Sequence, residues 1–296
     1  MSLIATLVSS PADPQVGDAL VTAARAALGQ ADARILAPGV AAEFPVPATL
    51  TASEAEARLA GVVADRKVDI AVLPAANRRK RLLLADMDST MIGQECIDEL
   101  ADFAGLKDRV AAITERAMRG EIAFEPALRE RVALLKGLPH AVVDEVLESR
   151  ITLTPGGIEL VRTMRANGAY TALVSGGFTL FTGPIRTRIG FHEDRSNTLN
   201  ADAGFLDGTV AEPILGREAK LATLVELRDR HGLLPDDTLA VGDGANDLAM
   251  IKAAGLGVAF RAKPAVAAEA RARITHADLT ALLHLQGYTA DDFVRG

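Results

Sequence analysis

The sequence predicts an α/β protein: a doubly wound parallel sheet with an inserted helical cap, preceded by a smaller α+β unit. After residue 80, apolar segments of strand length alternate with amphipathic helical segments, as expected for parallel strands joined by helical crossovers. Residues 94–147 interrupt this alternation and show no strand pattern. Residues 1–80 have another order of elements and are neutral, with eight basic and eight acidic residues.

The first unit, placed at residues 1–76, is predicted to have the order strand, helix, strand, strand, helix, strand. This order is the ferredoxin-like plan. Gly29 ends the first helix, and Ser53, with Glu56 three residues later, is expected to cap the second. We expect the boundary in the polar run 76–80. The elements are expected at Leu3–Val8, Pro14–Leu28, Ala33–Leu36, Ala42–Val46, Ser53–Ala64 and Val68–Leu73.

The second unit, placed at residues 80–296, is predicted to hold the parallel sheet. Its insertion, at about residues 93–150, reads as consecutive helices that cover the carboxyl edge of the sheet. Turn residues within 197–210 predict a β-hairpin. Strands are expected at Arg81–Met87, Tyr170–Val174, Thr238–Val241, Leu256–Ala259 and Arg273–Thr275. Helices are expected at Gln94–Ala104, Lys107–Met118, Glu125–Lys136, His140–Ser149, Pro155–Asn167, Phe178–Ile189, Arg217–Arg230 and Asn246–Ala253, and from Asp278 onward.

The composition narrows the class of function. The net charge of −7 argues against a nucleic-acid-binding protein, which needs a basic face. No apolar run reaches the ~18 residues of a membrane helix, and no signal peptide is visible. Cys96 is the single cysteine, so an intrachain disulfide is excluded. We therefore expect a soluble cytoplasmic protein that binds neither nucleic acid nor membranes.

The first candidate motif is Asp86-Met87-Asp88-Ser89-Thr90, directly after an apolar strand. The two carboxylates lie at i and i+2 of an extended segment and so point the same way. A divalent cation would offset their charge, one Asp could act as a nucleophile, and the other could act as general acid and base. Taken alone, the segment is also typical of a turn that caps the next helix.

Two further motifs could bind an anion. Ser175 and Gly176 follow the strand at 170–174, where a hydroxyl and backbone N–H groups at a helix start can hold phosphate. Lys220, in the helix at 217–230, could neutralise a phosphate as a point charge. In isolation, these are also typical of an ordinary glycine-rich turn and a solvated surface lysine.

The fourth motif is Gly242-Asp243-Gly244-Ala245-Asn246-Asp247, between a strand and a helix. Carboxylate oxygens at such a sheet edge suit Mg²⁺, which prefers carboxylates, phosphate oxygens and water. A tight turn in which Asn246 or Asp247 caps the helix is the alternative. All four motifs are expected to meet, because ligands of doubly wound sheets bind beyond the carboxyl ends of the strands.

In this order, the four motifs resemble those of the haloacid dehalogenase superfamily. Asp88 at the +2 position resembles its phosphatase branch. Further similarity, from about residue 82 to 285, is to the phosphoserine phosphatase family. It lies in Asp86–Thr90 with Glu95, and in the segments 121–125, 128–132 and 134–139. By strand order and position alone, the N-terminal unit is similar to the ACT-like regulatory domains of some bacterial members.

The resemblance implies a role for each motif residue. Asp86 is the expected nucleophile and Asp88 the general acid and base, while Mg²⁺ is held by Asp86, the Asp88 backbone carbonyl and Asp243, with Asp247 behind them. The remaining residues are expected to bind O-phospho-L-serine. Ser175, Gly176, Lys220 and Asn246 would contact its phosphate, Glu95 its ammonium and Arg131 its carboxylate, and Phe124 would close the cap.

Three hypotheses remain open at this point. The first is an Mg²⁺-dependent phosphoserine phosphatase that completes serine biosynthesis. The second keeps the chemistry but transfers the phosphoryl group to another alcohol, or hydrolyses another small phosphorylated amino acid or metabolite. The third is an amino-acid sensor that only binds, which the complete set of motifs disfavours. L-serine or another amino-acid effector at the N-terminal unit, and a homodimer, are further expectations from the resemblance.

Overall fold

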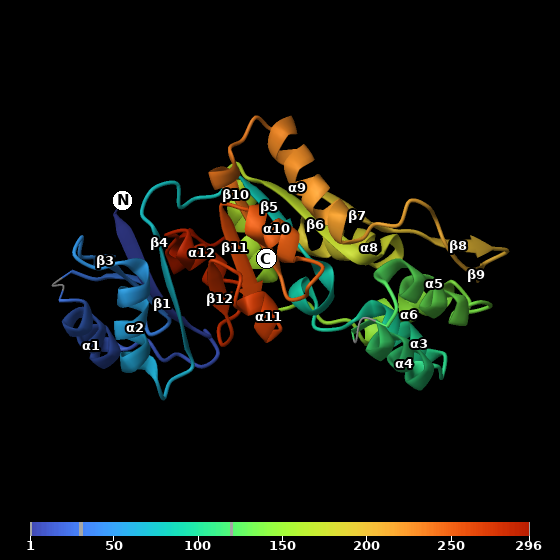
Figure 1. Cartoon of the computed structure of the whole chain (residues 1–296), viewed down its shortest axis with the longest axis horizontal. Coiled ribbons are helices and arrows are strands. Elements are labelled where there is room, and N and C mark those ends of the chain that lie inside the picture. Colours follow the sequence, from blue (N-terminus) through green and yellow to red (C-terminus); the bar gives the residue numbers. More distant parts are fainter. Residues whose placement is uncertain (1, 30–31, 119–120, 296) are drawn as a thin grey trace.

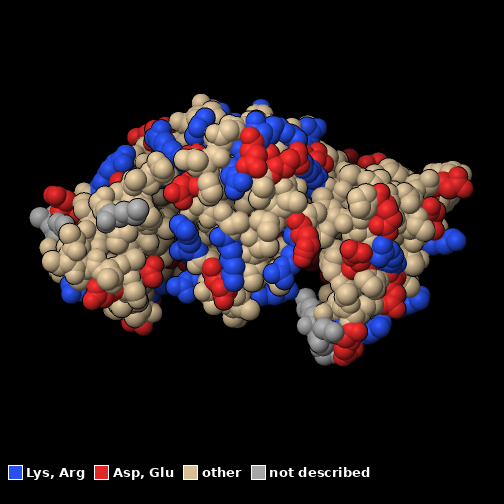
Figure 2. All heavy atoms as spheres, turned by 45° about the horizontal axis from the view of Figure 1, so that its top comes forward, with Lys and Arg blue, Asp and Glu red and all other residues tan. Residues whose placement is uncertain are grey.

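The computed structural model describes residues 2–29, 32–118 and 121–295. Along its long axis, Figure 1 shows an antiparallel-sheet unit at one end, a parallel sheet in the centre and a helical cap at the other end. Acidic and basic side chains are intermixed over the face shown in Figure 2. Within the described ranges, no helix has the length and apolar character needed to cross a membrane.

The N-terminal unit is an antiparallel sheet covered on one face by two helices. The sheet order is β2-β3-β1-β4, and α1 and α2 pack on the face that presents Ala5 and Leu7. This arrangement confirms the ferredoxin-like prediction. The elements are β1 (Leu3–Ser9), α1 (Asp18–Leu28), β2 (Arg34–Ala37), β3 (Ala41–Val46), α2 (Ala52–Val63) and β4 (Val68–Pro74).

The start of α2 differs from the prediction. Thr51, not Ser53, is the capping residue: its side chain accepts a hydrogen bond from the Glu54 N–H, and the Glu54 carboxylate accepts one from the Thr51 N–H. Thr51 and Glu54 have the same spacing as Ser53 and Glu56. The sequence therefore offered two capping boxes, and the helix uses the earlier one.

The central sheet has, among the described residues, the order β12-β11-β10-β5-β6-β7, with all neighbouring strands parallel. Its inner strands are mostly apolar because helices cover both faces. The strands are β5 (Leu82–Ala85), β6 (Tyr170–Phe178), β7 (Glu193–Asn197), β10 (Thr238–Gly242), β11 (Leu256–Phe260) and β12 (Ala272–Ile274). The helices are α7 (Gly157–Ala166), α8 (Thr179–Ile189), α9 (Arg217–Arg230), α10 (Leu248–Ala253), α11 (Pro264–Ala267) and α12 (Ala281–Leu285).

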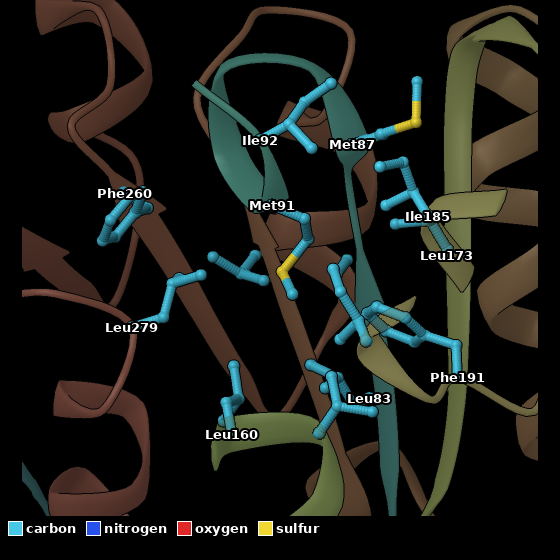
Figure 3. Close-up of a cluster of buried hydrophobic side chains, with 14 of the residues drawn as sticks. Leu83, Met87, Met91, Ile92, Leu160, Leu173, Ile185, Phe191, Phe260 and Leu279 are labelled. Atoms are coloured by element: carbon cyan, nitrogen blue, oxygen red, sulfur yellow. The ribbon is translucent and has the colours of Figure 1, made fainter. Parts of the chain in front are cut away.

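Alternating side chains of the parallel strands form two separate apolar clusters. Leu82 and Leu84 pack with α9 and α10, whereas Leu83 packs with α7 and α8. Figure 3 shows Met87 and Met91 in the second cluster. These methionines lie on either side of Asp88 in the chain. Burial of their side chains fixes the irregular turn at Met87–Met91, while the Asp88 carboxylate stays at the sheet edge.

The strand β7 was not predicted. Its sequence, Glu193-Asp194-Arg195-Ser196-Asn197, has no apolar alternation. It forms the outer strand next to β6, and its side chains are mostly half-buried in polar contacts, such as the 2.8 Å bond from the Tyr170 hydroxyl to Glu193. Strands are recognised in a sequence by alternating apolar and polar residues. A strand whose side chains form ion pairs lacks this alternation and is therefore not predicted. The predicted helix from Asp278 is also shorter than expected, since it begins at Ala281.

The cap is attached to the sheet by two adjacent linkers and by a hairpin. The linkers pair at Gly93 N to Thr152 O (3.0 Å) and Thr154 N to Met91 O (3.0 Å). The predicted hairpin lies between β7 and α9 and extends over the cap, where Leu206 accepts from Gly137 N at 2.8 Å. The elements are α3 (Cys96–Phe103), α4 (Lys107–Met118), α5 (Phe124–Leu134), α6 (Ala141–Ser149), β8 (Leu199–Asp202) and β9 (Phe205–Val210).

The N-terminal unit is joined to the parallel-sheet unit by buried polar contacts. The carboxylate of Asp69 in β4, which is 5% exposed, accepts hydrogen bonds from the backbone N–H groups of Thr275, His276 and Ala277. The face of the N-terminal sheet opposite its helices also contributes Val8 to the same apolar cluster as the parallel sheet. One face of the N-terminal sheet therefore packs in the apolar cluster of the parallel-sheet unit, while its other face forms a separate cluster with α1 and α2.

Candidate active site

The predicted site residues converge at one edge of the parallel sheet. Strand β5 lies between β10 and β6, and all three are parallel, so their carboxyl ends are neighbours. Asp86 follows β5, Ser175 lies near the end of β6, and Asp243 follows β10. Helix α9 brings Lys220 to the same place. The local order of strand and helix therefore assembles residues that are up to 157 positions apart in sequence, from Asp86 to Asp243.

Lys220 lies between two carboxylates at the centre of this edge. Its Nζ atom is 2.6 Å from Asp86 Oδ1 and 2.7 Å from Asp247 Oδ1. Its side chain is 1% exposed, so the prediction of a pocket lysine, rather than a surface one, agrees with the geometry. Burial by itself would lower the pKa of this ammonium, but the two carboxylates raise it above its usual value. Lys220 is therefore a permanent cation here.

Three carboxylates form a cluster that could hold a metal ion. Asp86, Asp243 and Asp247 each offer an oxygen, and these oxygens lie within 4.8 Å of one another. Burial, and then repulsion from Asp247, raises the pKa of Asp86 well above its usual range and that of Asp243 to about 6. An all-oxygen donor set under mutual repulsion fits a hard divalent cation. Asp247 is already engaged by Lys220 and by the Gly244 N–H at 3.0 Å.

Asp88 has different surroundings from Asp86. Its Oδ1 accepts from the Cys96 backbone N–H at 3.1 Å, and its Oδ2 accepts from the Ser175 hydroxyl at 3.3 Å. Its side chain is outside the three-carboxylate cluster. Burial raises the pKa of Asp88, although the hydrogen bonds from Cys96 oppose the shift. Two carboxyl groups two residues apart thus have separate environments, one beside Lys220 and one beside Ser175.

Two glycines are required by the packing of these carboxylates. A Cβ on Gly177 would lie 2.8 Å from Asp88 Oδ2, and a Cβ on Gly242 would lie within 2.7 Å of the Asp247 Cβ. Either substitution would displace a carboxylate from the site. The backbone N–H of Gly177 also donates to the Ser175 hydroxyl at 2.9 Å, which orients that hydroxyl toward Asp88.

The cap brings the predicted recognition residues over this edge. A Cβ built on Gly176 would lie 3.4 Å from the Phe124 ring, and one on Gly216 would lie 3.5 Å from it. Glu95, at the start of α3, accepts a 2.7 Å hydrogen bond from the Ser89 hydroxyl. Phe124 is still 38% exposed, so its ring borders an open cleft.

Glu95 lies close enough to Arg131 to affect the ionisation of that guanidinium. Displacement of water from the Glu95 carboxylate, followed by the negative charge of Asp88, raises the pKa of Glu95 to about 7. Burial lowers the pKa of Arg131, while Asp98 and Glu95 oppose that shift. The Arg131 side chain donates to Thr114 Oγ1 at 3.4 Å inside the cap. A carboxyl group at the start of α3 and a guanidinium on α5 thus lie near each other in the cap.

The remaining predicted residue, Asn246, lies in the loop after β10, where its side chain folds over Gly244. Sequence reasoning missed three contributors. Ser89, in a left-handed conformation at φ 55°, holds Glu95, and the Cys96 N–H holds Asp88. Asn197 is the third, and it gave no signal because it lies in the unpredicted strand β7.

This combination defines a class of hydrolase, a two-carboxylate enzyme with a cationic anchor and a helical cap. The chain belongs to the haloacid dehalogenase-like hydrolases, whose family model matches residues 83–252. The phosphoserine phosphatase of Polaromonas sp. is 47% identical over 210 residues, which cover 69% of this chain and 89% of that relative. The residues matched by the family model include all four motifs.

Two solved structures resemble almost the whole chain. A haloacid dehalogenase family hydrolase from Salmonella enterica serovar Typhi has a TM-score of 0.85 at 30% identity, covering 96% of this chain and 98% of that one. An unliganded structure of a probable phosphoserine phosphatase from Vibrio cholerae has a TM-score of 0.78 at 33% identity, covering 98% of this chain and 88% of that one. The N-terminal unit is therefore part of the likeness.

Proposed function

We propose that this chain is a cytoplasmic phosphoserine phosphatase, which hydrolyses O-phospho-L-serine to L-serine and phosphate in the last step of serine biosynthesis. The observation that carries the proposal is the separation of two carboxyl groups: Asp86 pairs with Lys220, and Asp88 with Ser175. Carboxyl groups with different environments can take different roles in one reaction. The family and the named relatives support the same reaction class.

Asp86 is the proposed nucleophile. One of its oxygens attacks phosphorus from the side opposite the serine oxygen. A bond forms between the Asp86 oxygen and phosphorus, and the bond between phosphorus and the serine oxygen breaks. The product of this step is an aspartyl-phosphate and serine. Lys220, 2.6 Å from Asp86, opposes the effect of burial on the pKa of this carboxyl group, and its positive charge reduces the repulsion between the carboxylate and the dianionic ester.

Asp88 is the proposed general acid and base. Burial raises its pKa, which favours the protonated form needed at the start of the reaction. It gives its proton to the departing serine oxygen and then takes one from the water that attacks phosphorus. This second attack breaks the bond between phosphorus and the Asp86 oxygen, so phosphate leaves and both aspartates return to their first states.

The other motif residues are proposed to hold the phosphate. The Ser175 hydroxyl, the Gly176 N–H and the Lys220 ammonium would contact the phosphate oxygens, where negative charge remains throughout the transfer. Asn246 would position the phosphate from the loop after β10. In this assignment Gly177 has a supporting role, since its N–H orients the Ser175 hydroxyl.

Mg²⁺ is the proposed cofactor. The residues that would hold it are Asp86, Asp243 and the backbone carbonyl of Asp88, with Asp247 supporting them through Lys220 and Gly244. When bound, the ion would neutralise the carboxylates and the phosphate oxygens beside them. Burial, and then repulsion from Asp247, raises the pKa of Asp86 and Asp243, so a bound divalent cation would favour the ionised form of both groups.

The cap is proposed to recognise the amino-acid part of the substrate. Glu95 would pair with the ammonium group, and Arg131 would bind the carboxylate through its planar fork. Phe124, which rests over Gly176, would close the cleft and help to exclude water. The proximity of the Glu95 carboxyl group to the Arg131 guanidinium supports this assignment.

The domain assignment also remains a proposal. We place an ACT-like effector unit at residues 1–76 and the phosphatase at 80–296, with its cap at about 93–150. The strand order of the antiparallel sheet in residues 1–76 supports an effector unit. This unit would bind L-serine or another amino acid, within a homodimer. Calorimetric titration of L-serine into the full chain tests this, because binding of a second L-serine per chain would indicate a site besides the proposed active site.

The first experiment measures phosphate release from O-phospho-L-serine, with and without Mg²⁺, against phosphothreonine and sugar phosphates. Rapid, Mg²⁺-dependent release that is selective for phosphoserine supports the proposal. Release from the other esters alone would keep Asp86 and Asp88 and discard Glu95 and Arg131. Release that requires an added alcohol would favour the phosphotransferase, and no release from any ester would contradict the enzymatic assignment.

A further inference from the structure

One buried amide near the site has no part in the mechanism described above. Asn197, the last residue of β7, is 2% exposed. Its Nδ2 donates to the Gly176 carbonyl at 2.9 Å and to the Leu215 carbonyl at 3.2 Å, and its Oδ1 accepts from the Leu215 N–H at 2.6 Å. One side chain therefore satisfies three backbone groups in two different loops.

The first of these loops needs support from a side chain. In the ladder between β6 and β7, Val174 pairs with Arg195, and the next pair is Phe178 with Asn197. Four steps along β6 thus match two along β7, so Ser175, Gly176 and Gly177 bulge out of the sheet. The ladder cannot hold a carbonyl within such a bulge. The Asn197 amide holds the carbonyl of Gly176 in its place.

The second loop leads to Lys220. Leu215 immediately precedes Gly216, which begins the helix that carries the lysine. Because Asn197 binds both the N–H and the carbonyl of Leu215, it fixes this loop as a strand partner would. Gly176 and Gly216 are also the two glycines beneath the Phe124 ring. The Asn197 amide therefore holds both backbone segments against which the Phe124 ring packs.

We infer that Asn197 is a positioning residue for phosphate binding: it holds the backbone of Gly176, through its carbonyl, and the start of the Lys220 helix at a fixed spacing. The inference rests on the proposed function for the nature of the bound group, a phosphate. Asn197 itself touches neither substrate nor metal ligand. It acts through two backbone segments, and the hairpin that binds the cap leaves the sheet directly after it.

The test compares Asn197→Ala and Asn197→Asp with the wild-type enzyme and with Asn200→Ala. Asn200 is a matched control because it lies on the hairpin, where its Nδ2 binds the Thr209 hydroxyl at 2.8 Å. For each protein, kcat and KM for phosphoserine, the inhibition constant of inorganic phosphate and the melting temperature are measured. Calorimetric binding of inorganic phosphate is measured as well, because this readout does not need turnover.

We expect Asn197→Ala to lower kcat/KM at least tenfold and to weaken phosphate binding by at least threefold, at temperatures where the variant is folded. Asn197→Asp keeps an acceptor for Leu215 but loses the donor for Gly176, so it should not restore phosphate binding. Asn200→Ala should match the wild type. A lower melting temperature with unchanged kcat/KM and phosphate affinity would overturn the inference, as would failure of both Asn197 variants to fold.

These outcomes are separable from failure of the proposed function. If the wild type does not hydrolyse phosphoserine but binds inorganic phosphate, calorimetry still compares the variants, and a loss in both Asn197 variants supports the positioning role. If wild-type turnover is normal and the Asn197 variants are also normal, the proposed function stands and the positioning role is wrong.

Discussion

The ammonium of Lys220 lies 2.6 Å from Asp86, and both side chains are almost completely buried, at 1% and 6% exposure. A second carboxylate, from Asp247, approaches the same ammonium at 2.7 Å. Two anions thus share one cation in a region from which water is largely excluded. The net negative charge that remains is the physical basis of the proposed metal site, and it makes the cluster sensitive to the loss of any member.

Replacement of Lys220 by Met should therefore strongly reduce the stability of the folded protein. Removal of one partner from a buried ion pair typically costs about 3–5 kcal/mol of stability, because it leaves an uncompensated charge. We expect a loss of that size in the free energy of unfolding, measured with urea in the presence of a chelator. The control is Lys252→Met, which removes an exposed pair with Glu269 and should cost below about 1 kcal/mol. Equal effects of the two substitutions would contradict the assigned role of Lys220.

Replacement of the proposed nucleophile, Asp86→Asn, should abolish turnover and leave phosphate binding largely intact. The amide can still accept a hydrogen bond from Lys220, but it cannot form the aspartyl-phosphate. We expect kcat to fall by about 1000-fold or more, as for other catalytic nucleophiles. Phosphate release and calorimetric phosphate binding are the measurements. Normal turnover in this variant would show that another group attacks phosphorus.

The metal site is tested by thermal stability. Because an ion that binds the folded state alone stabilises it, Mg²⁺ at about 100 times its Kd should add about 2.7 kcal/mol. We expect Mg²⁺ to raise the melting temperature of the wild type and of Asp229→Asn, whose carboxylate lies on the surface beside Arg228. The increase should be much smaller in Asp243→Asn. An equal increase in both variants would place the ion elsewhere.

The order of the elements and the four motifs could be predicted because each leaves a local signal. Buried parallel strands give apolar runs, and Asp86, Ser175 and Asp243 follow such runs directly. Parallel topology then brings the carboxyl ends of neighbouring strands together. The sequence could not show that Lys220 binds both Asp86 and Asp247, because the position of a helix relative to a strand depends on packing.

Polar contacts between distant segments could not be predicted. Asn197 lies in a charged strand with no apolar period, and its partners, Gly176 and Leu215, are 21 and 18 residues away. The contact of Asp69 with Thr275 spans 206 residues. Such contacts satisfy backbone groups that secondary structure leaves free, and residue type alone does not indicate which group is left free.

The ionisation of Glu95 predicts a pH dependence. Its pKa of about 7 lies above the usual 4.5, so the carboxyl group is largely protonated below pH 7 and charged above it. Only the charged form can pair with the substrate ammonium. We therefore expect KM for phosphoserine to fall as the pH rises through about 7.

The measurement is the pH profile of kcat/KM for the wild type and for Glu95→Gln. The phosphate group of the substrate titrates near pH 6 in both cases, so it cancels in the ratio of the two profiles. The ratio should rise with pH and level off above about pH 8. A ratio that is flat from pH 5 to 9 would remove Glu95 from ammonium recognition.

The interface between the two units gives the last prediction. Asp69 is buried and accepts from the backbone N–H groups of Thr275, His276 and Ala277. Substitution by Ala leaves these donors without a partner, at a typical cost of about 1–3 kcal/mol for a buried group. Asp69→Asn keeps one acceptor oxygen and should cost less.

The effect is measured as the free energy of unfolding, with Asp65→Ala as an exposed control in the same unit. Because Val8 and Ala71 of the N-terminal sheet share a core with Leu279 and Leu282, deletion of residues 1–76 would also expose apolar surface. We expect the truncated chain to aggregate or to lose stability. If it instead melts at the wild-type temperature, and Asp69→Ala is as stable as Asp65→Ala, the interface contributes nothing to folding and the two units are independent.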